Sequence, residues 1–404
     1  MQGILTMSPK ERDRLKIVEQ ICNGKMTVAE AVHILILSER QVYRLLKRYR
    51  AEGDMGLIHK LRGSPSKRGY PEEIKKRAIT LYWQQYRDYG PTLFSETLLK
   101  YHGISADHET IRRWLMASGG SNVHRKKRPH RHKRERRSAI GELIQFDGSH
   151  HDWFEGRGPA CCLLHAIDDA SGRAFLRFVP SENGADVLRM LRIYCERYGI
   201  PRAVYTDHGS VFYAENKLTD VGRALKTVGV EIIYANSPQA KGRVERGNRT
   251  HQDRLIKSLR REGISTMHDA NQHLEKVYLD DHNNRFASTN DLPDVHRSTE
   301  GYDLTNIFCF QTERQVYNDY TITLGGQYIQ LLIGETPLPH PQQYVIVRRW
   351  LDGSLHIFWN DYELCFKYLN GKPKSKIRKP QPPSPTHPWR FYTIGKARYA
   401  RIRR

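Results

Sequence analysis

Three acidic residues stand where their carboxylates could meet and do chemistry. Asp147 lies in or at the end of a run expected to form a strand, Asp207 directly follows another such run, and Glu245 opens a long expected helix. In α/β folds, strand ends and helix starts meet at one sheet edge, where ligands bind. Three unpaired carboxylates repel one another, and two Mg²⁺ ions about 3.5–4 Å apart would compensate them. Such a pair, with Mn²⁺ as a substitute, activates a water or a hydroxyl for phosphodiester displacement.

The segment around these residues alternates strand and helix signals. The expected strands are at 142–146, 160–167, 174–179, 201–206 and 230–234, and the expected helices at 184–198, 218–227 and 238 to about 261. Ser237 and Pro238 supply the N-cap and the first residue of the last helix. This order predicts an α/β core with a mixed five-stranded sheet and helices on its faces.

Three motifs accompany the acidic residues: FDG at 146–148, TDHGSVF at 206–212 and NSPQAKGRVERGNRT at 236–250. Together they resemble the catalytic core of the DDE transposases and retroviral integrases, which has a ribonuclease-H-like fold. The resemblance covers about residues 138–290, and the block around Glu245 is its most specific part. The layout ahead of it is similar to that of bacterial insertion-sequence transposases such as the ISNCY group.

The resemblance implies a role for each matching residue. Asp147, Asp207 and Glu245 are then the catalytic residues and the ligands of two Mg²⁺ ions, which is the only cofactor implied. Lys241, Arg246 and Arg249 would face DNA near the active site. The N-terminal His/Cys zinc unit of retroviral integrases is not expected, because Cys22 is the only cysteine before residue 161.

Other carboxylates compete for the catalytic positions. Asp168 and Asp169 could replace a catalytic aspartate, but they lie in an expected hairpin turn, where such residues are common for backbone reasons. Asp152 and Glu155 follow the first strand and could take the place of the first carboxylate.

Two adjacent pairs also offer metal-ligand atoms. Neighbouring residues on a strand point to opposite faces, so at most one of His150 and His151 is expected near the site. Cys161 and Cys162 are interpreted as strand packing.

The N-terminal third predicts two helix-turn-helix units, at 1–60 and 70–123. In the first, Thr27 and Ser38 each begin a capping-box pattern, and the helix after Ser38 has one apolar and one basic face. In the second, Ser105 is expected to cap a basic helix. A basic second helix fits the DNA major groove. The residues expected to contact DNA here are Arg40, Gln41, Arg44, Lys47, Arg48, Arg112 and Arg113.

The net charge of +22 is concentrated in two short segments. Residues 124–137 carry +8 and residues 371–404 carry +11, whereas residues 138–309 carry −3. Basic arms bind phosphates, so double-stranded DNA is the expected partner and affinity should fall with salt. In the first arm, Lys126, Lys127 and Arg128 are the residues expected to contact DNA.

The remaining features complete the domain plan. The core is expected at 138–309, a small SH3-like β-barrel at 310–370 and a basic, proline-rich tail at 371–404. No apolar stretch is long enough for a membrane span, the N-terminus lacks a signal core, and six scattered cysteines favour a reducing compartment. A cytoplasmic, nucleoid-associated bacterial protein is expected.

The sequence therefore predicts a transposase that binds terminal inverted repeats, cleaves 3′ ends and joins them to target DNA, acting at least as a dimer. Two alternatives stay open. One is a catalytically silent domesticated transposase that acts as a DNA-binding regulator. The other is a stand-alone nuclease with the same core.

Overall fold

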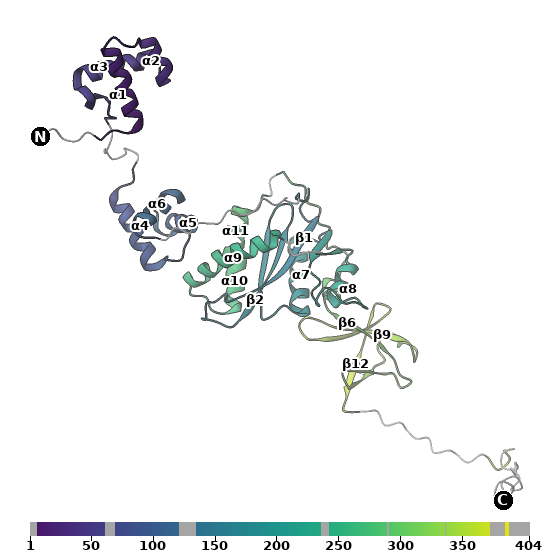
Figure 1. The fold of residues 1–404 in the computed structure, drawn as a ribbon. Helices are drawn as coiled ribbons and strands as arrows, with labels where there is room; N and C mark the ends of the chain where they lie inside the picture. The colour runs from purple at the N-terminus through teal and green to yellow at the C-terminus, as the bar shows by residue number, and fades with distance from the viewer. Residues whose placement is uncertain are drawn as a thin grey trace, which may run out of the picture. The chain divides into compact units, whose positions relative to one another are not determined.

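The computed structural model describes residues 6–60, 69–120, 135–235, 242–288, 291–335, 337–371 and 384–387. The chain forms two compact units, Met1–Arg128 and Pro129–Arg404, drawn in Figure 1. Each unit is described by itself.

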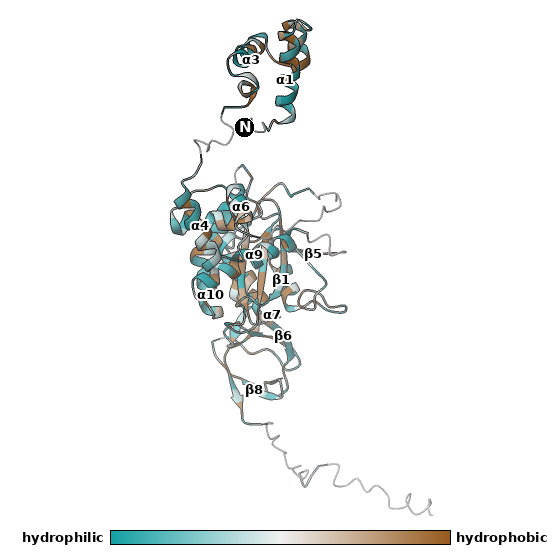
Figure 2. Ribbon diagram, turned by 60° about the vertical axis from the view of Figure 1, so that its left-hand side comes forward, coloured by the Kyte–Doolittle hydropathy of each residue, from teal (hydrophilic) through white to brown (hydrophobic). Residues whose placement is uncertain are grey.

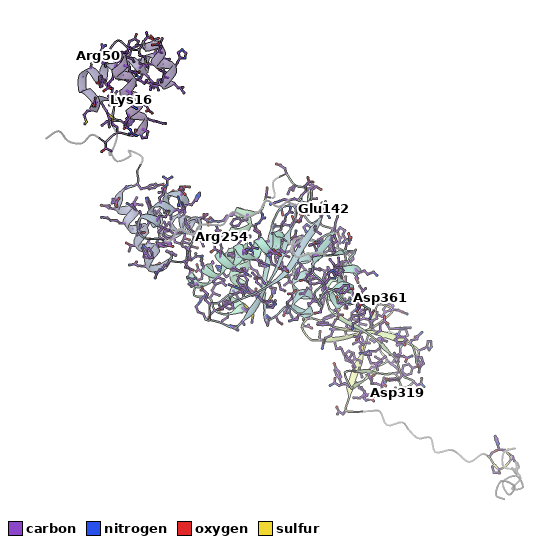
Figure 3. All side chains as sticks on the ribbon, viewed as in Figure 1. Lys16, Arg50, Glu142, Arg254, Asp319 and Asp361 are labelled. Carbon is purple, nitrogen blue, oxygen red and sulfur yellow. The ribbon has the colours of Figure 1, made fainter. Side chains whose placement is uncertain are left out.

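The first unit begins with a small helical bundle. It consists of α1 (Pro9–Cys22), α2 (Val28–Leu35), α3 (Glu39–Glu52) and the short 3₁₀ helix η1 (Gly53–Leu57). Val18, Ala31 and Val42 are fully buried at its centre. Polar side chains such as Lys16 and Arg50 project from the outside of this bundle (Figure 3).

One of the two capping boxes predicted for this bundle is confirmed. Thr27 caps α2 in a full capping box with Glu30, as predicted. Ser38 does occupy the N-cap position of α3, but its side chain makes no capping hydrogen bond, so the second capping box is wrong. Helix α2 ends at Leu35, because Ile36 adopts a left-handed conformation that stops it.

A second set of helices follows in the same unit. It contains α4 (Glu72–Gln85), α5 (Pro91–His102) and α6 (His108–Ala117), with Phe94, Leu98 and Ile111 in its core. The predicted cap Ser105 is wrong. Asp107 directly precedes α6, and its carboxylate accepts the backbone N–H of Glu109.

The second unit contains the predicted mixed five-stranded sheet. Its strands are β1 (Leu143–His151), β2 (Cys161–Asp168), β3 (Ala174–Val179), β4 (Ala203–Thr206) and β5 (Glu231–Tyr234). They lie in the order β3-β2-β1-β4-β5. The hairpin strands β1 to β3 are antiparallel, and β4 and β5 are parallel to β1.

Helices lie on both faces of this sheet (Figure 1). They are α7 (Gly184–Tyr198), α8 (Asp220–Thr227), α9 (Gly242–Arg261), α10 (Met267–His273) and α11 (Leu279–Phe286), with a π-helical turn η3 (Leu274–Tyr278) between the last two. The strands around β1 are largely apolar, whereas α10 is largely hydrophilic (Figure 2). A large apolar core, which includes Phe146, Leu163 and Leu188, fills the space between sheet and helices.

The start of the longest helix is only partly described. The predicted cap Ser237 and Pro238 lie outside the described residues, and the described part of α9 begins at Gly242. It ends at Arg261, as predicted.

The C-terminal part of this unit is all-β after a short helix, α12 (Leu304–Ile307). Its strands are β6 (Phe310–Gln315), β7 (Thr321–Leu324), β8 (Gln327–Leu331), β9 (Tyr344–Arg349), β10 (Leu355–Trp359), β11 (Tyr362–Leu364) and β12 (Phe366–Leu369).

The predicted SH3-like barrel is not confirmed. Strand pairing in the described residues gives two separate sheets, β11-β10-β9-β6 and β12-β8-β7, with no ladder that closes them into a barrel. Instead both sheets contribute to one apolar cluster, with Ile322 and Ile329 from one sheet and Val347 from the other. Among the described helices, none combines the length and the hydrophobicity that a bilayer crossing requires.

Candidate active site

Strand register brings the first two acidic residues to neighbouring positions. In the parallel pair of β1 and β4, Leu143 pairs with Ala203 and Gln145 pairs with Tyr205. Continuing this register by two residues puts Asp147 opposite Asp207, the first residue after β4. Adjacent strands lie about 4.8 Å apart, so the two backbones are neighbours at this edge. The 60-residue interval between the aspartates is thus the register offset of the two strands.

Helix α9 approaches the same strand from one face of the sheet. The side chain of Asn248 donates from Nδ2 to Oδ2 of Asp147 at 2.9 Å, and the backbone N–H of Val244 donates to Oε1 of Gln145 at 3.4 Å. Glu245 precedes Asn248 by three residues, and residues at this spacing share a helix face. Glu245 therefore lies one turn from the group that holds Asp147.

The carboxylates differ in exposure and in local support. Asp147 and Glu245 are half-buried, whereas Asp207 is exposed. The backbone N–H of Gly209 donates to Oδ1 of Asp207 at 2.9 Å, which fixes this carboxylate in a tight turn. The site is thus open to solvent on one side and supported by the protein on the other.

The donor set fits magnesium. All three side chains offer carboxylate oxygens, which Mg²⁺ prefers, and Mg²⁺ keeps several waters, so few protein ligands suffice. The carboxylate oxygens of these three described side chains do not all lie within 4.8 Å of one another. This looser spacing suits a site shared by two ions and their waters.

A buried polar network continues from Asp147 into the core. Oδ1 of Asn248 accepts a hydrogen bond from Nδ1 of His165 at 2.9 Å, and Nδ2 of Asn248 donates to Asp147. His165 lies on β2, directly across from Asp147 in the β1–β2 pair. Its ring meets that of His251 edge to face, and His251 bonds to the hydroxyl of Tyr278.

Burial keeps these histidines neutral. It lowers the pKa of His165 to about 4, against the opposing effect of its hydrogen bond with Asn248. It also lowers the pKa of His251 well below the usual value. The ring of His282 on α11 contacts that of His251, and burial lowers the pKa of His282 to about 3. The interior beside Asp147 therefore adds no positive charge near neutral pH.

The carboxylates of the hairpin turn are used to hold the turn together. Asp168 accepts the backbone N–H groups of Gly141 and Ser171 and the Ser171 hydroxyl. Asp169 is buried and pairs with Arg243 at 2.6 Å while accepting from Gln145. These bonds give both residues a structural role, in line with the backbone interpretation.

The other competing pair lies in a surface turn. Asp152 accepts the backbone N–H of Gly156 within that turn. Glu155 pairs with Arg260 near the end of α9 at 2.7 Å. These contacts anchor the turn after β1 to α9.

The basic face predicted on α3 is largely at the surface. Arg40, Gln41, Arg44 and Lys47 are exposed. Arg48 is half-buried and donates from Nη2 to the backbone carbonyl of Ile58 at 2.9 Å. It therefore ties η1 to the helix, a structural role that the sequence pattern did not predict.

The two arginines of α6 share one carboxylate. Arg112 binds both oxygens of Glu109, at 2.7 and 2.8 Å, and Arg113 binds one at 3.3 Å. The hydrogen bond from Arg112 is the main reason that the pKa of Glu109 falls to about 2. This helix face carries less net charge than its two arginines alone would give.

The remaining predicted DNA contacts fall into two groups. Arg246 and Arg249 are exposed on α9, beside Glu245. Lys126, Lys127, Arg128 and Lys241 lie outside the described residues.

Sequence reasoning missed the residues that support the site. Asn248 could have been found from its i+3 spacing to Glu245 on a helix. His165 could not, because its place opposite Asp147 depends on the register of the hairpin.

Comparisons with known proteins place this chain in a family. Residues 13–66 match the helix-turn-helix domain model, which agrees with the predicted first unit. The protein named "Putative transposase y4bF" of Sinorhizobium fredii is 39% identical over 380 residues, spanning 91% of this chain and 83% of that protein. The transposase for insertion sequence IS1202 of Streptococcus pneumoniae is 28% identical, spanning 94% and 93%.

Two solved structures are weakly similar to this chain. The HTLV-2 integrase catalytic core in complex with magnesium is 17% identical and covers 34% of this chain and 88% of its own, with a TM-score of 0.29. The simian T-cell lymphotropic virus intasome in complex with PP2A regulatory subunit B56 gamma is 14% identical and covers 66% and 96%, with a TM-score of 0.32. Scores this low add nothing to the assignment.

The helix-turn-helix match makes the N-terminal part a DNA-binding module by class. With a relative 39% identical over nearly the whole chain, this chain belongs to the transposases. The prediction of a transposase is confirmed.

Proposed function

We propose that Asp147, Asp207 and Glu245 form the catalytic centre of this transposase and hold two Mg²⁺ ions. The observation that carries the proposal is the register that sets Asp147 beside Asp207, with Asn248 of α9 bonded to Asp147. Bound there, the ions would activate a water or a DNA 3′-hydroxyl and stabilise the leaving oxygen.

The chain's own residues then bind and orient. Asn248 holds one oxygen of Asp147 by a hydrogen bond, and Gly209 holds one oxygen of Asp207. These two hydrogen bonds orient the carboxylates of Asp147 and Asp207. Arg246 and Arg249 extend from the same helix into solvent, where they can contact DNA phosphates.

Recognition of the element ends belongs to the N-terminal helices. The exposed Arg40, Gln41, Arg44 and Lys47 would read the terminal inverted repeats, with Arg112 and Arg113 adding contacts from α6. The basic segments 124–137 and 371–404 would bind phosphates. Cleaved 3′ ends would be joined to target DNA, and pairing of two ends requires at least a dimer. Such a protein would work at the bacterial nucleoid.

The test uses DNA that carries the coding region's own flanks. Wild type, Glu245→Gln and the control Glu231→Gln are incubated with this DNA and Mg²⁺ or Mn²⁺. Glu231 is an exposed acid on β5 of the same sheet. Binding, nicking and joining are scored separately.

Wild type and the control should bind, cut and join, while Glu245→Gln only binds. Binding without cutting by wild type under either metal would favour the regulator. Cutting without joining would favour the nuclease.

A further inference from the structure

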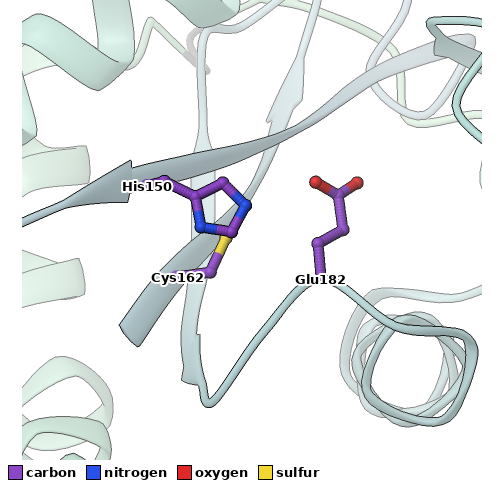
Figure 4. Close-up of side chains that lie close together, drawn as sticks. All are labelled: His150, Cys162 and Glu182. Carbon is purple, nitrogen blue, oxygen red and sulfur yellow. The ribbon is translucent and has the colours of Figure 1, made fainter. Parts of the chain in front are cut away.

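A second group of metal-ligand atoms lies elsewhere on the sheet. A ring nitrogen of His150, the thiol of Cys162 and a carboxylate oxygen of Glu182 all lie within 4.8 Å of one another. His150 is on β1, Cys162 on β2 and Glu182 on the segment that leads into α7. Figure 4 shows the imidazole over the cysteine and the carboxylate facing them from the other side.

Strand pairing builds this cluster. His150 pairs directly with Cys162 in the antiparallel register of β1 and β2. Because side chains alternate along a strand, the neighbours His151 and Cys161 point to the opposite face. His150 and Cys162 thus lie together on one face of the sheet, and His151 and Cys161 lie on the other.

Gly148 makes room for the third member. A Cβ atom at this position would lie 3.3 Å from Sγ of Cys162 and in severe clash with Oε2 of Glu182. The glycine of the FDG motif therefore leaves the space that the Glu182 carboxylate occupies, and a side chain at this position would displace that carboxylate. Its backbone is held in β1, between Asp147 and Ser149.

The cluster and the catalytic carboxylates use opposite faces of the same strand. Asp147 faces α9 through Asn248, and Ser149 faces it through Gln252. Gly148 and His150 alternate with these residues and so face the segment before α7. A ligand held by the cluster would lie across the sheet from the catalytic carboxylates.

The chemistry of the donors differs from that of the acidic site. A thiol and an imidazole suit zinc-class ions, whereas Mg²⁺ prefers oxygen ligands. Zinc sites with three protein ligands keep a fourth position for water, and the exposed His150 leaves the cluster open to solvent. Ligand atoms around zinc lie about 3.3–3.8 Å apart, given bonds of about 2.0–2.3 Å, so small side-chain rotations would complete the site.

We propose that His150, Cys162 and Glu182 bind one zinc-class divalent cation, which ties β1 and β2 to the segment before α7. The cation also screens the repulsion between a thiolate and the Glu182 carboxylate. Without a cation, burial and then the Glu182 carboxylate raise the pKa of the Cys162 thiol to about 12. Binding therefore displaces a proton and becomes tighter as pH rises.

The test is a cobalt titration of the untagged full-length protein with Mg²⁺ in excess. Co²⁺ stands in for zinc and gives a thiolate-to-cobalt absorption band that a carboxylate site cannot give. Wild type should show this band with one equivalent bound. Cys162→Ser should abolish the band. His150→Ala should weaken Co²⁺ binding by more than about 100-fold, a larger loss than is typical when a residue that only supports a metal ligand is removed.

The neighbouring residues supply matched controls. Cys161→Ser and His151→Ala change the same residue types one position away, on the opposite face, and should keep both band and affinity. Because His150 is exposed, its variant should fold even if Cys162→Ser does not.

Absence of the band in wild type, or its survival in His150→Ala with unchanged affinity, would overturn the proposal. The readout needs no DNA and no cleavage, so it is independent of the proposed function.

Discussion

At the residue scale, the proposed site combines three carboxylates with the amide of Asn248. Asn248 is buried in the stripe of α9 that faces the sheet, among Val244, His251 and Leu255. A polar residue is stable there only if its hydrogen bonds are made, and Asn248 bonds to both Asp147 and His165. Its placement fixes which way the Asp147 carboxylate turns.

We expect Asn248→Ala to lower the cleavage rate about 10- to 100-fold, the range typical of residues that orient metal ligands. The Mg²⁺ concentration needed for half-maximal cleavage should rise, because the Asp147 carboxylate is no longer held. DNA binding should not change. Cleavage rates measured across a Mg²⁺ titration provide the check.

Thr250→Ala is the matched control for Asn248. Thr250 lies on the same helix, and its hydroxyl bonds to the backbone carbonyl of Arg246. If Asn248→Ala slowed cleavage with an unchanged Mg²⁺ requirement, Asn248 would be a packing residue only.

Residue types and spacing led to the three acidic residues proposed here as the catalytic centre, and the i+3 spacing to Glu245 could have pointed to Asn248. They could not have pointed to His165, because its place opposite Asp147 follows from the register of β1 and β2. Nor could they have pointed to Glu182, because its place near Cys162 follows from the path of the segment before α7.

At the element scale, the interface of β2, α9 and α11 is built around neutral histidines. His165, His251 and His282 come from these three elements, and their rings contact one another in sequence. Burial lowers the pKa of each. The unfolded chain therefore binds protons at these residues at a pH where the folded core does not.

Acidification should consequently destabilise the core. A histidine whose pKa is lowered by folding contributes no penalty above its unfolded pKa of about 6.5. Below that pH, each one costs up to about 1.4 kcal/mol per pH unit until its folded pKa is reached, about 4 for His165. Urea unfolding at about pH 7 and about pH 5 should show the loss.

A variant tests whether these histidines cause the effect. His165→Gln should reduce the loss of stability between the two pH values, because one titrating group is gone. His268→Gln, a change at an exposed histidine on α10 that bonds to Gln272 one turn further along the helix, should leave the loss unchanged. Equal pH dependence in all three proteins would contradict the explanation.

The elements themselves were largely predictable. The helix at 184–198 and the strand at 174–179 have the predicted bounds, because apolar periodicity and turn residues agree there. The helix α4 and the strand β6 were not predicted. β1 extends five residues further than its apolar pattern suggests, since pairing with β2 continues to His151.

At the scale of the whole molecule, charge is divided between arms and core. The two basic segments carry +19 of the net +22, whereas the core is slightly acidic. An acidic core suits a cation site, and basic arms suit phosphates. The sequence alone predicts this division, but not the two-sheet form of the C-terminal part, which depends on long-range strand pairing.

DNA affinity should therefore fall steeply with salt. The logarithm of affinity should decrease with a slope of about −0.9 for each phosphate neutralised. A chain that ends at Gly371 lacks eleven basic residues and should show a shallower slope. Binding isotherms at several salt concentrations measure both slopes, and identical slopes would remove the tail from the DNA interface.

The central claim is that Asp147, Asp207 and Glu245 bind the catalytic metal together, and anomalous diffraction from crystals soaked in Mn²⁺ tests it most directly. The account predicts manganese peaks between these three carboxylates, and their loss in Glu245→Gln crystals. Manganese bound at Asp168 and Asp169, with none between the three carboxylates, would contradict it.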